Sequence, residues 1–244
     1  MREFASGSSG SMSWAEDRGF AIHSAVNERL GFLRRTYTHL LVEICLVGAV
    51  AFYVLHSPAL LDGIAKPLMG NLILYLLAFF GVSLVSRRLM AGRTSSVVQY
   101  SGAGLWVLFL GFLIAPFAWY IQQVTGSFAI LGQAFVMTAC IFTGLTAYVF
   151  YTRKDFSAWG GAIGMITMAV FGVSVVMAFM GGGGGIIYSL VWVVLMGGWV
   201  LYDTSNILHR RHVDQHVAAS VDLLVDFVYM FINLAMLILG GSRR

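Results

Sequence analysis

Long apolar runs separated by short polar segments dominate the chain from residue 37 onward. Each run is close to the roughly 20 residues that a helix needs to cross a bilayer. The pattern predicts seven transmembrane helices, near residues 37–57, 69–86, 97–120, 128–151, 158–180, 186–207 and 217–240. No linker or change of composition divides these runs, so we expect one all-α membrane domain over residues 36–244.

Residues 1–35 have a different character, being polar and mixed in charge. The opening Met1–Ser13 is rich in Ser and Gly, which is typical of disorder, and it lacks the apolar core of a signal peptide. Between residues 20 and 35, apolar side chains recur at helical spacing, as in a short amphipathic helix lying on a membrane. We therefore interpret residues 1–35 as a polar cytoplasmic tail.

Composition supports placing the apolar runs in lipid. Of the 244 residues, 59% are hydrophobic and 11% charged, whereas a soluble domain carries about 25% charged residues. The net charge of +4 lies in short loops, so we expect the bilayer and not nucleic acid as the partner. Cys45 and Cys140 fall within apolar runs and are interpreted as packing residues.

The distribution of basic residues predicts the orientation. Only Lys66, Arg243 and Arg244 fall on one side of the predicted helices. The other twelve lie in the tail and in alternate loops, namely Arg2, Arg18, Arg29, Arg34, Arg35, Arg87, Arg88, Arg93, Arg153, Lys154, Arg210 and Arg211. By the positive-inside rule the N-terminus is cytoplasmic, in a bacterial inner membrane. An odd number of spans puts the C-terminus outside, although Arg243 and Arg244 leave open a last segment that enters the membrane and returns.

Acidic residues inside the apolar runs are the main candidates for function. Glu43, Asp203 and Asp226 lie within such runs, and Asp222 lies one turn before Asp226. A membrane-embedded charge costs a few kcal/mol, so it needs a partner or a function. Two neighbouring carboxyl groups cannot both ionise cheaply and can share one proton; ionised, they offer oxygen ligands that suit Ca²⁺. Alternatively they hydrogen-bond adjacent helices, which we favour for Glu43.

The sequence gives no support for an enzyme or for a bound cofactor. An intramembrane aspartyl protease needs a Gly-x-Gly-Asp segment, but Leu224 and Val225 precede Asp226. Neither a Gly-x-Ser-x-Gly motif nor a phosphate-binding loop is present. Three histidines lie near Asp214, at His209, His212 and His216, and we interpret them as a solvated loop rather than a metal site.

Three segments together suggest a family. They are Leu201-Tyr202-Asp203-Thr204, the stretch from Ala218-Ala219-Ser220 to Leu223-Leu224-Val225-Asp226-Phe227 with Gly240 beyond it, and Thr152-Arg153-Lys154-Asp155-Phe156-Ser157. They resemble the two acidic signatures and the basic-Asp-Leu-Ser loop of the Bax inhibitor (YccA-like) family, over roughly residues 30–240. The resemblance implies a seven-helix fold with the last helix central.

The resemblance also implies a function, that of a pH-sensitive calcium-leak channel. In that family two aspartates form a closed latch with an arginine of helix two. By match, the aspartates are Asp203 and Asp226, and the arginine is Arg87 or Arg88. The same aspartates are possible calcium ligands. The sequence departs from the family at Asp222, where a small polar residue is usual, and it lacks an acidic residue in helix three.

A second role follows from the bacterial YccA-like members, which resemble substrates and modulators of the membrane protease FtsH. FtsH grips their cytoplasmic N-terminal tail, and residues 1–35 are long enough to be gripped. The alternative function is therefore a non-transporting partner that modulates proteolysis or stress responses.

Overall fold

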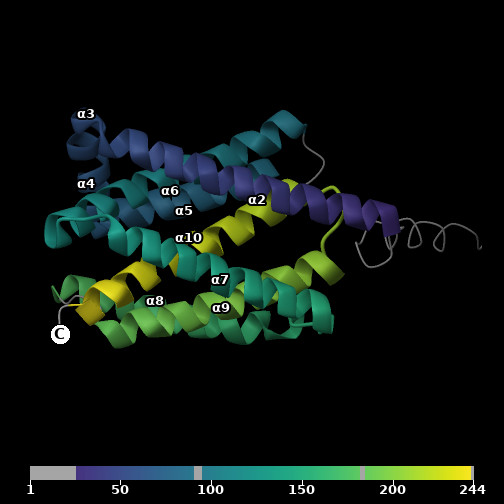
Figure 1. Ribbon diagram of the computed structural model, residues 1–244. Helices are drawn as coiled ribbons and strands as arrows, with labels where there is room; N and C mark the ends of the chain where they lie inside the picture. Colours follow the sequence, from purple (N-terminus) through teal and green to yellow (C-terminus); the bar gives the residue numbers. More distant parts are fainter. Residues whose placement is uncertain (1–25, 91–94, 182–184, 243–244) are drawn as a thin grey trace, which may run out of the picture.

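The computed structural model describes residues 26–90, 95–181 and 185–242, and in these residues it contains helices and no strand. Seven of the described helices are long and apolar enough to cross a membrane (Figure 1). They are α2 (Val26–Leu55), α5 (Leu72–Met90), α6 (Ser96–Thr125), α7 (Ala129–Thr152), α8 (Gly160–Phe179), α9 (Ile186–His209) and α10 (His216–Ser242). The predicted all-α membrane fold is thus confirmed.

Helix α2 differs from its prediction at the N-terminal end. It begins at Val26 and runs unbroken to Leu55, so residues 26–35 extend the first span instead of forming a separate surface helix. Glu28, Arg34 and Arg35 are good helix formers, and no proline interrupts them. The remaining part of the expected surface helix and of the tail, residues 1–25, lies outside the described residues.

The connection between α2 and α5 is helical. It consists of α3 (Pro58–Leu60), the π-helical turn η1 (Leu61–Ala65) and α4 (Lys66–Gly70). Pro58 and Pro67 lie in first turns, where a missing N–H breaks no helical hydrogen bond. Lys66 pairs with Asp62 at 2.6 Å and lies 3.5 Å above the ring of Trp119, which ties this segment to α6.

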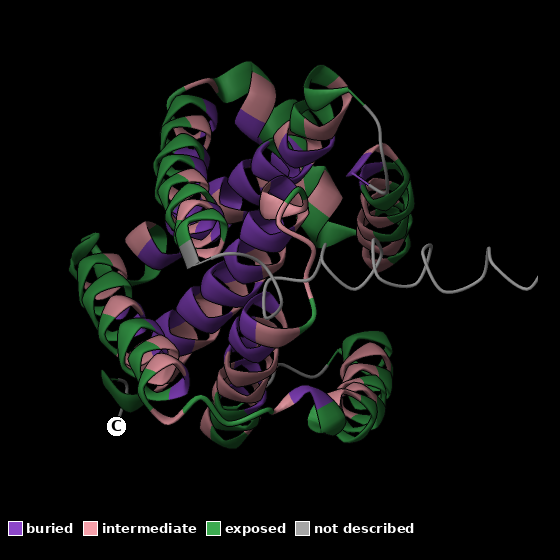
Figure 2. Cartoon of the chain, turned by 90° about the vertical axis from the view of Figure 1, so that its right-hand side faces the viewer, coloured by how far each residue is buried: buried purple, intermediate pink, exposed green. Residues whose placement is uncertain are grey.

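Helix α10 passes through the middle of the bundle (Figure 1), and the buried residues of the chain gather at the centre of the bundle (Figure 2). It packs against α9, α2, α7, α6 and α5, and large side chains such as Leu223, Met230 and Leu234 are almost fully buried. The central position expected for the last helix is confirmed. Helix α10 continues as one unbroken helix to Ser242, and the side of the membrane on which it ends stays a prediction.

The outer surface of the bundle is apolar, as lipid requires. Most residues of α5 and α8 are exposed or half-buried, including Leu77 and Met165. Cys45 and Cys140 are also exposed, so their interpretation as packing residues was wrong. A helix that is apolar on every side gives no periodic signal to tell the lipid-facing side from the interior.

Helices α2 and α6 approach each other closely at Gly111. A Cβ atom at this position would overlap the side chain of Val50 on α2. The glycine therefore allows the two helices to pack without a gap, as small residues do between membrane helices.

Candidate functional site

The hairpin of α9 and α10 brings two of the predicted site residues together. Residues 210–215 reverse the chain between the helices, which then pack against each other. Asp203 on α9 and Asp226 on α10 meet across this interface, where each carboxyl group acts directly on the other. Asp226 is only 5% exposed, and its Oδ2 atom has no hydrogen-bond partner. A buried oxygen without a partner is costly unless the group carries or shares a proton.

Asp222 belongs to the same cluster, one turn before Asp226. Its carboxylate forms an ion pair with the guanidinium of Arg211, which comes from the α9–α10 loop. The charge of Arg211 also acts on Asp203, and that of Arg87 acts on Asp222. Asp222, which departs from the family pattern, is therefore paired with a cation, Arg211.

The formal charges of this aspartate cluster (Asp203, Asp222, Asp226, Arg87 and Arg211) do not balance when every group is ionised. Three carboxylates face two guanidinium groups, which leaves one excess negative charge. A single proton on the cluster makes it neutral. Since charge in a membrane interior is costly, the composition of the cluster favours a state that holds one proton.

The cluster lies at one end of a cavity of about 630 Å³. Side chains of α4, α5, α6, α8, α9 and α10 line this cavity, which we call the aspartate cavity. It extends from Arg87, Asp203 and Asp222 to Met69 and Met236. Both Arg87 and Arg88 are exposed, but only Arg87 is among the residues that line the cavity.

Hydroxyl groups lie along the walls of the aspartate cavity. The hydroxyls of Tyr75 and Tyr229 are 2.8 Å apart, joining α5 to α10. Tyr188 donates to Ser174 at 2.6 Å, joining α9 to α8. Sequence reasoning missed these residues because an uncharged hydroxyl in an apolar run is not distinctive. It also missed Arg211, whose position in a loop is equally typical of an ordinary positive-inside residue.

Glu43 lies apart from the cluster. It does not line the aspartate cavity, and its Oε1 is 2.9 Å from the hydroxyl of Ser220 on α10. Its exposed fraction is 6%, and its Oε2 has no partner.

The basic-Asp loop motif, residues 152–157, contacts the C-terminal end of α9 through a hydrogen bond and an ion pair. Asp155 accepts hydrogen bonds from the backbone N–H and the hydroxyl of Ser157, and Phe156 donates its N–H to Ser205 of α9 at 2.8 Å. Arg210 lies 3.8 Å from Asp155. The hydrogen bonds from Ser157, together with the charge of Arg210, lower the pKa of Asp155. This motif therefore joins the α7–α8 connection to the end of α9.

Calcium was predicted as a ligand of Asp203 and Asp226. In the described part of the chain, no group of three His, Cys, Asp or Glu side chains is arranged to hold a metal ion. Calcium prefers six to eight oxygen ligands, more than the two carboxyl groups of Asp203 and Asp226 supply.

The fold and the cluster define a class of protein: a multi-pass helical membrane protein with paired acidic groups beside its central helix. Residues 29–244 match the family model described as inhibitor of apoptosis-promoting Bax1. The chain belongs to this Bax inhibitor family, which confirms the family resemblance.

Relatives of the chain come from bacteria, animals and viruses. An uncharacterised protein of Pseudomonas aeruginosa is 29% identical over 93% of this chain and 99% of its own length. Mouse protein lifeguard 4 is 23% identical over 86% of this chain and 85% of its own. The Golgi anti-apoptotic protein of vaccinia virus is 24% identical over 93% and 92%. None of these names describes a catalysed reaction.

Proposed function

We propose that this protein is a proton-controlled cation leak of the bacterial inner membrane, with its N-terminus in the cytoplasm and Ca²⁺ as the expected permeant ion. The observation that carries the proposal is the placement of Asp203, Asp226 and Arg87 on one cavity. Orientation rests on the positive-inside distribution of Lys and Arg.

The aspartate cluster supplies the proton control. With one proton held, its charges balance and the two arginines can hold the carboxylates in a closed latch. Loss of that proton leaves an excess negative charge, which repels within the cluster and attracts a cation. The closed and the cation-attracting states thus differ by one proton.

The aspartate cavity supplies a route for the ion. It runs from the cluster past the Tyr75–Tyr229 hydroxyl pair toward Asn233, so a partly dehydrated cation would meet oxygen atoms along its length. Hard cations such as Ca²⁺ bind to oxygen ligands of this kind.

Calcium flux into proteoliposomes, measured across pH, tests the proposal. Asp203→Asn and Asp226→Asn should each change the pH dependence of flux, and the double variant should add little, because both remove the same shared proton. Flux raised at neutral pH indicates a latch, and flux lowered indicates that the pair binds the ion. Arg87→Gln should alter the profile and Arg88→Gln should not. Additive effects of the two aspartate variants, or no flux from the wild type, would refute the mechanism.

A further inference from the structure

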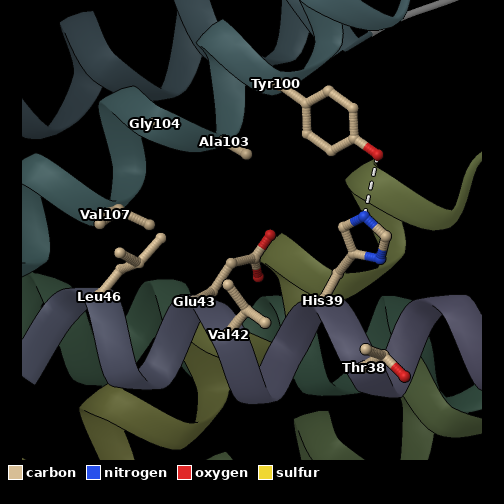
Figure 3. Close-up of a pocket in the computed structure, with 9 residues that line it drawn as sticks. All are labelled: Thr38, His39, Val42, Glu43, Leu46, Tyr100, Ala103, Gly104 and Val107. Atoms are coloured by element: carbon tan, nitrogen blue, oxygen red, sulfur yellow. Dashed lines mark hydrogen bonds between the residues drawn. The ribbon is translucent and has the colours of Figure 1, made fainter.

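A second buried carboxyl group lies in a pocket of its own, between α2 and α6. The pocket has a volume of about 420 Å³ and includes Glu43, His39 and Tyr100 among its lining residues. Figure 3 shows the Glu43 carboxyl group pointing into this space, with His39 and Tyr100 on one side and Leu46 and Val107 on the other. We call it the Glu43 pocket; it shares no lining residue with the aspartate cavity.

One oxygen of Glu43 is satisfied in either protonation state. The Ser220 hydroxyl lies 2.9 Å from Glu43 Oε1 and 2.9 Å from the carbonyl oxygen of Val217. Its single proton can be donated to an ionised Glu43. When that proton goes to the carbonyl instead, a protonated Glu43 can donate to Ser220. Oε1 therefore has a partner whether Glu43 is charged or neutral.

The other oxygen, Oε2, is left without a partner, and the polar neighbours cannot supply one. His39 Nδ1 lies 2.7 Å from the carbonyl of Arg35, which can only accept, so Nδ1 carries the proton of the neutral ring. His39 Nε2 then accepts from the hydroxyl of Tyr100, 2.9 Å away. Neither side chain therefore has a hydrogen left for Glu43, and its buried Oε2 has no donor from the protein.

The other residues that line the Glu43 pocket indicate which kind of donor would bind there. Val42, Leu46, Ala103 and Val107 are apolar, and the small Ala103 and Gly104 leave the space that forms the pocket. A metal ion would find one carboxylate here, far fewer oxygens than Ca²⁺ takes. An ammonium group has three N–H donors, for which the Glu43 carboxylate and the hydroxyl oxygen of Tyr100 are the acceptors in this pocket. An attached hydrocarbon chain would cover the apolar walls. The Glu43 carboxylate and the apolar walls around it thus match a cation that carries a hydrocarbon chain.

We propose that the Glu43 pocket binds a single-chain amphipathic amine. Its ammonium group pairs with the Glu43 carboxylate, and its alkyl chain lies along Leu46 and Val107. His39 and Leu46 are seven residues apart on α2, so the pocket extends about 10 Å along the helix. Val42 and Leu46 are exposed on the bundle surface, so the amine enters from the bilayer. This site is separate from the proposed leak and does not depend on it.

Photolabelling in phosphatidylcholine nanodiscs tests the site. The probe is a diazirine-bearing dodecylamine, the uncharged comparison is the matching dodecanol, and labelled positions are mapped by mass spectrometry. In the wild type, the amine should label α2 and α6 around the pocket at least tenfold more than the alcohol. Glu43→Gln should remove this preference and leave labelling by the alcohol unchanged.

Steric variants keep the test decisive if Glu43→Gln does not fold. A side chain at Gly104 meets no neighbour within 4 Å, so Gly104→Leu should fill the pocket and abolish labelling by the amine. Gly164→Leu on α8 is equally unhindered, lies away from the pocket and should leave labelling unchanged. Asp226→Asn should also leave it unchanged, which separates this site from the aspartate cavity. Amine labelling that survives Glu43→Gln or Gly104→Leu would overturn the proposal.

Discussion

The charge balance of the aspartate cluster predicts that two substitutions, Arg211→Gln and Asp222→Asn, shift the pH midpoint of calcium flux in opposite directions. Arg211→Gln removes a cation and leaves two excess negative charges, so the cluster should retain its proton to higher pH. Asp222→Asn removes a carboxylate and leaves no excess negative charge, so the cluster should lose its proton at lower pH. We therefore expect the pH midpoint of calcium flux to rise in the first variant and fall in the second.

The size of the shift follows from the exposure of the ion pair. The side chains of Arg211 and Asp222 are 26% and 31% exposed, between the buried and surface cases. Breaking a buried pair costs about 3–5 kcal/mol, and an exposed pair contributes about 0–1 kcal/mol. An intermediate value of about 2 kcal/mol corresponds to a midpoint shift of roughly 1.5 pH units.

The double variant distinguishes charge balance from simple damage to the fold. Arg211→Gln combined with Asp222→Asn leaves two carboxylates and Arg87, which restores the single excess charge of the wild type. Its midpoint should return to within about half a pH unit of the wild-type value. The assay is calcium flux into proteoliposomes at a series of pH values, with circular dichroism as the folding control. Midpoints that move in the same direction, or a double variant that departs farther than either single one, would refute the reasoning.

Three further predictions concern packing, pH stability and orientation. Gly111→Ala should destabilise the protein by about 1–3 kcal/mol because its Cβ would overlap Val50; thermal denaturation should show no such loss for the unhindered Gly144→Ala. Hydrogen bonds from Ser157 lower the pKa of Asp155 in the folded protein. This carboxylate therefore stabilises the fold above the pKa of an unfolded Asp, about 3.9, and the stabilisation is lost as the pH falls through the lower pKa of the folded state. Asp155→Asn should therefore lower the melting temperature at pH 7 and reduce its fall on acidification, and an unchanged melting curve would argue against this. Reporter fusions at Gly126 and at the C-terminus should both be external, and a cytoplasmic C-terminus would contradict the orientation.

The sequence alone determined the number, order and approximate ends of the spanning helices. A lipid-embedded backbone must satisfy its own hydrogen bonds, so a long apolar run permits essentially one structure, and the run is visible without knowledge of its neighbours. The motifs around Asp203 and Asp226 also indicated the family, since residue types in a fixed order carry that information directly. Even here α2 began earlier than expected, because polar residues at its start are compatible with both a helix and a tail.

Tertiary structure decided which charged residues meet. Arg87 and Arg88 are adjacent in sequence and alike in charge, yet only Arg87 is among the residues lining the aspartate cavity. Arg211 looked like an ordinary loop residue until the α9–α10 turn placed it against Asp222. Glu43 resembled the other membrane carboxyl groups but faces a different pocket. In helices that are apolar on all sides, the sequence does not fix how each helix is rotated about its axis; packing against α10 sets that rotation and therefore the partners of every buried charge.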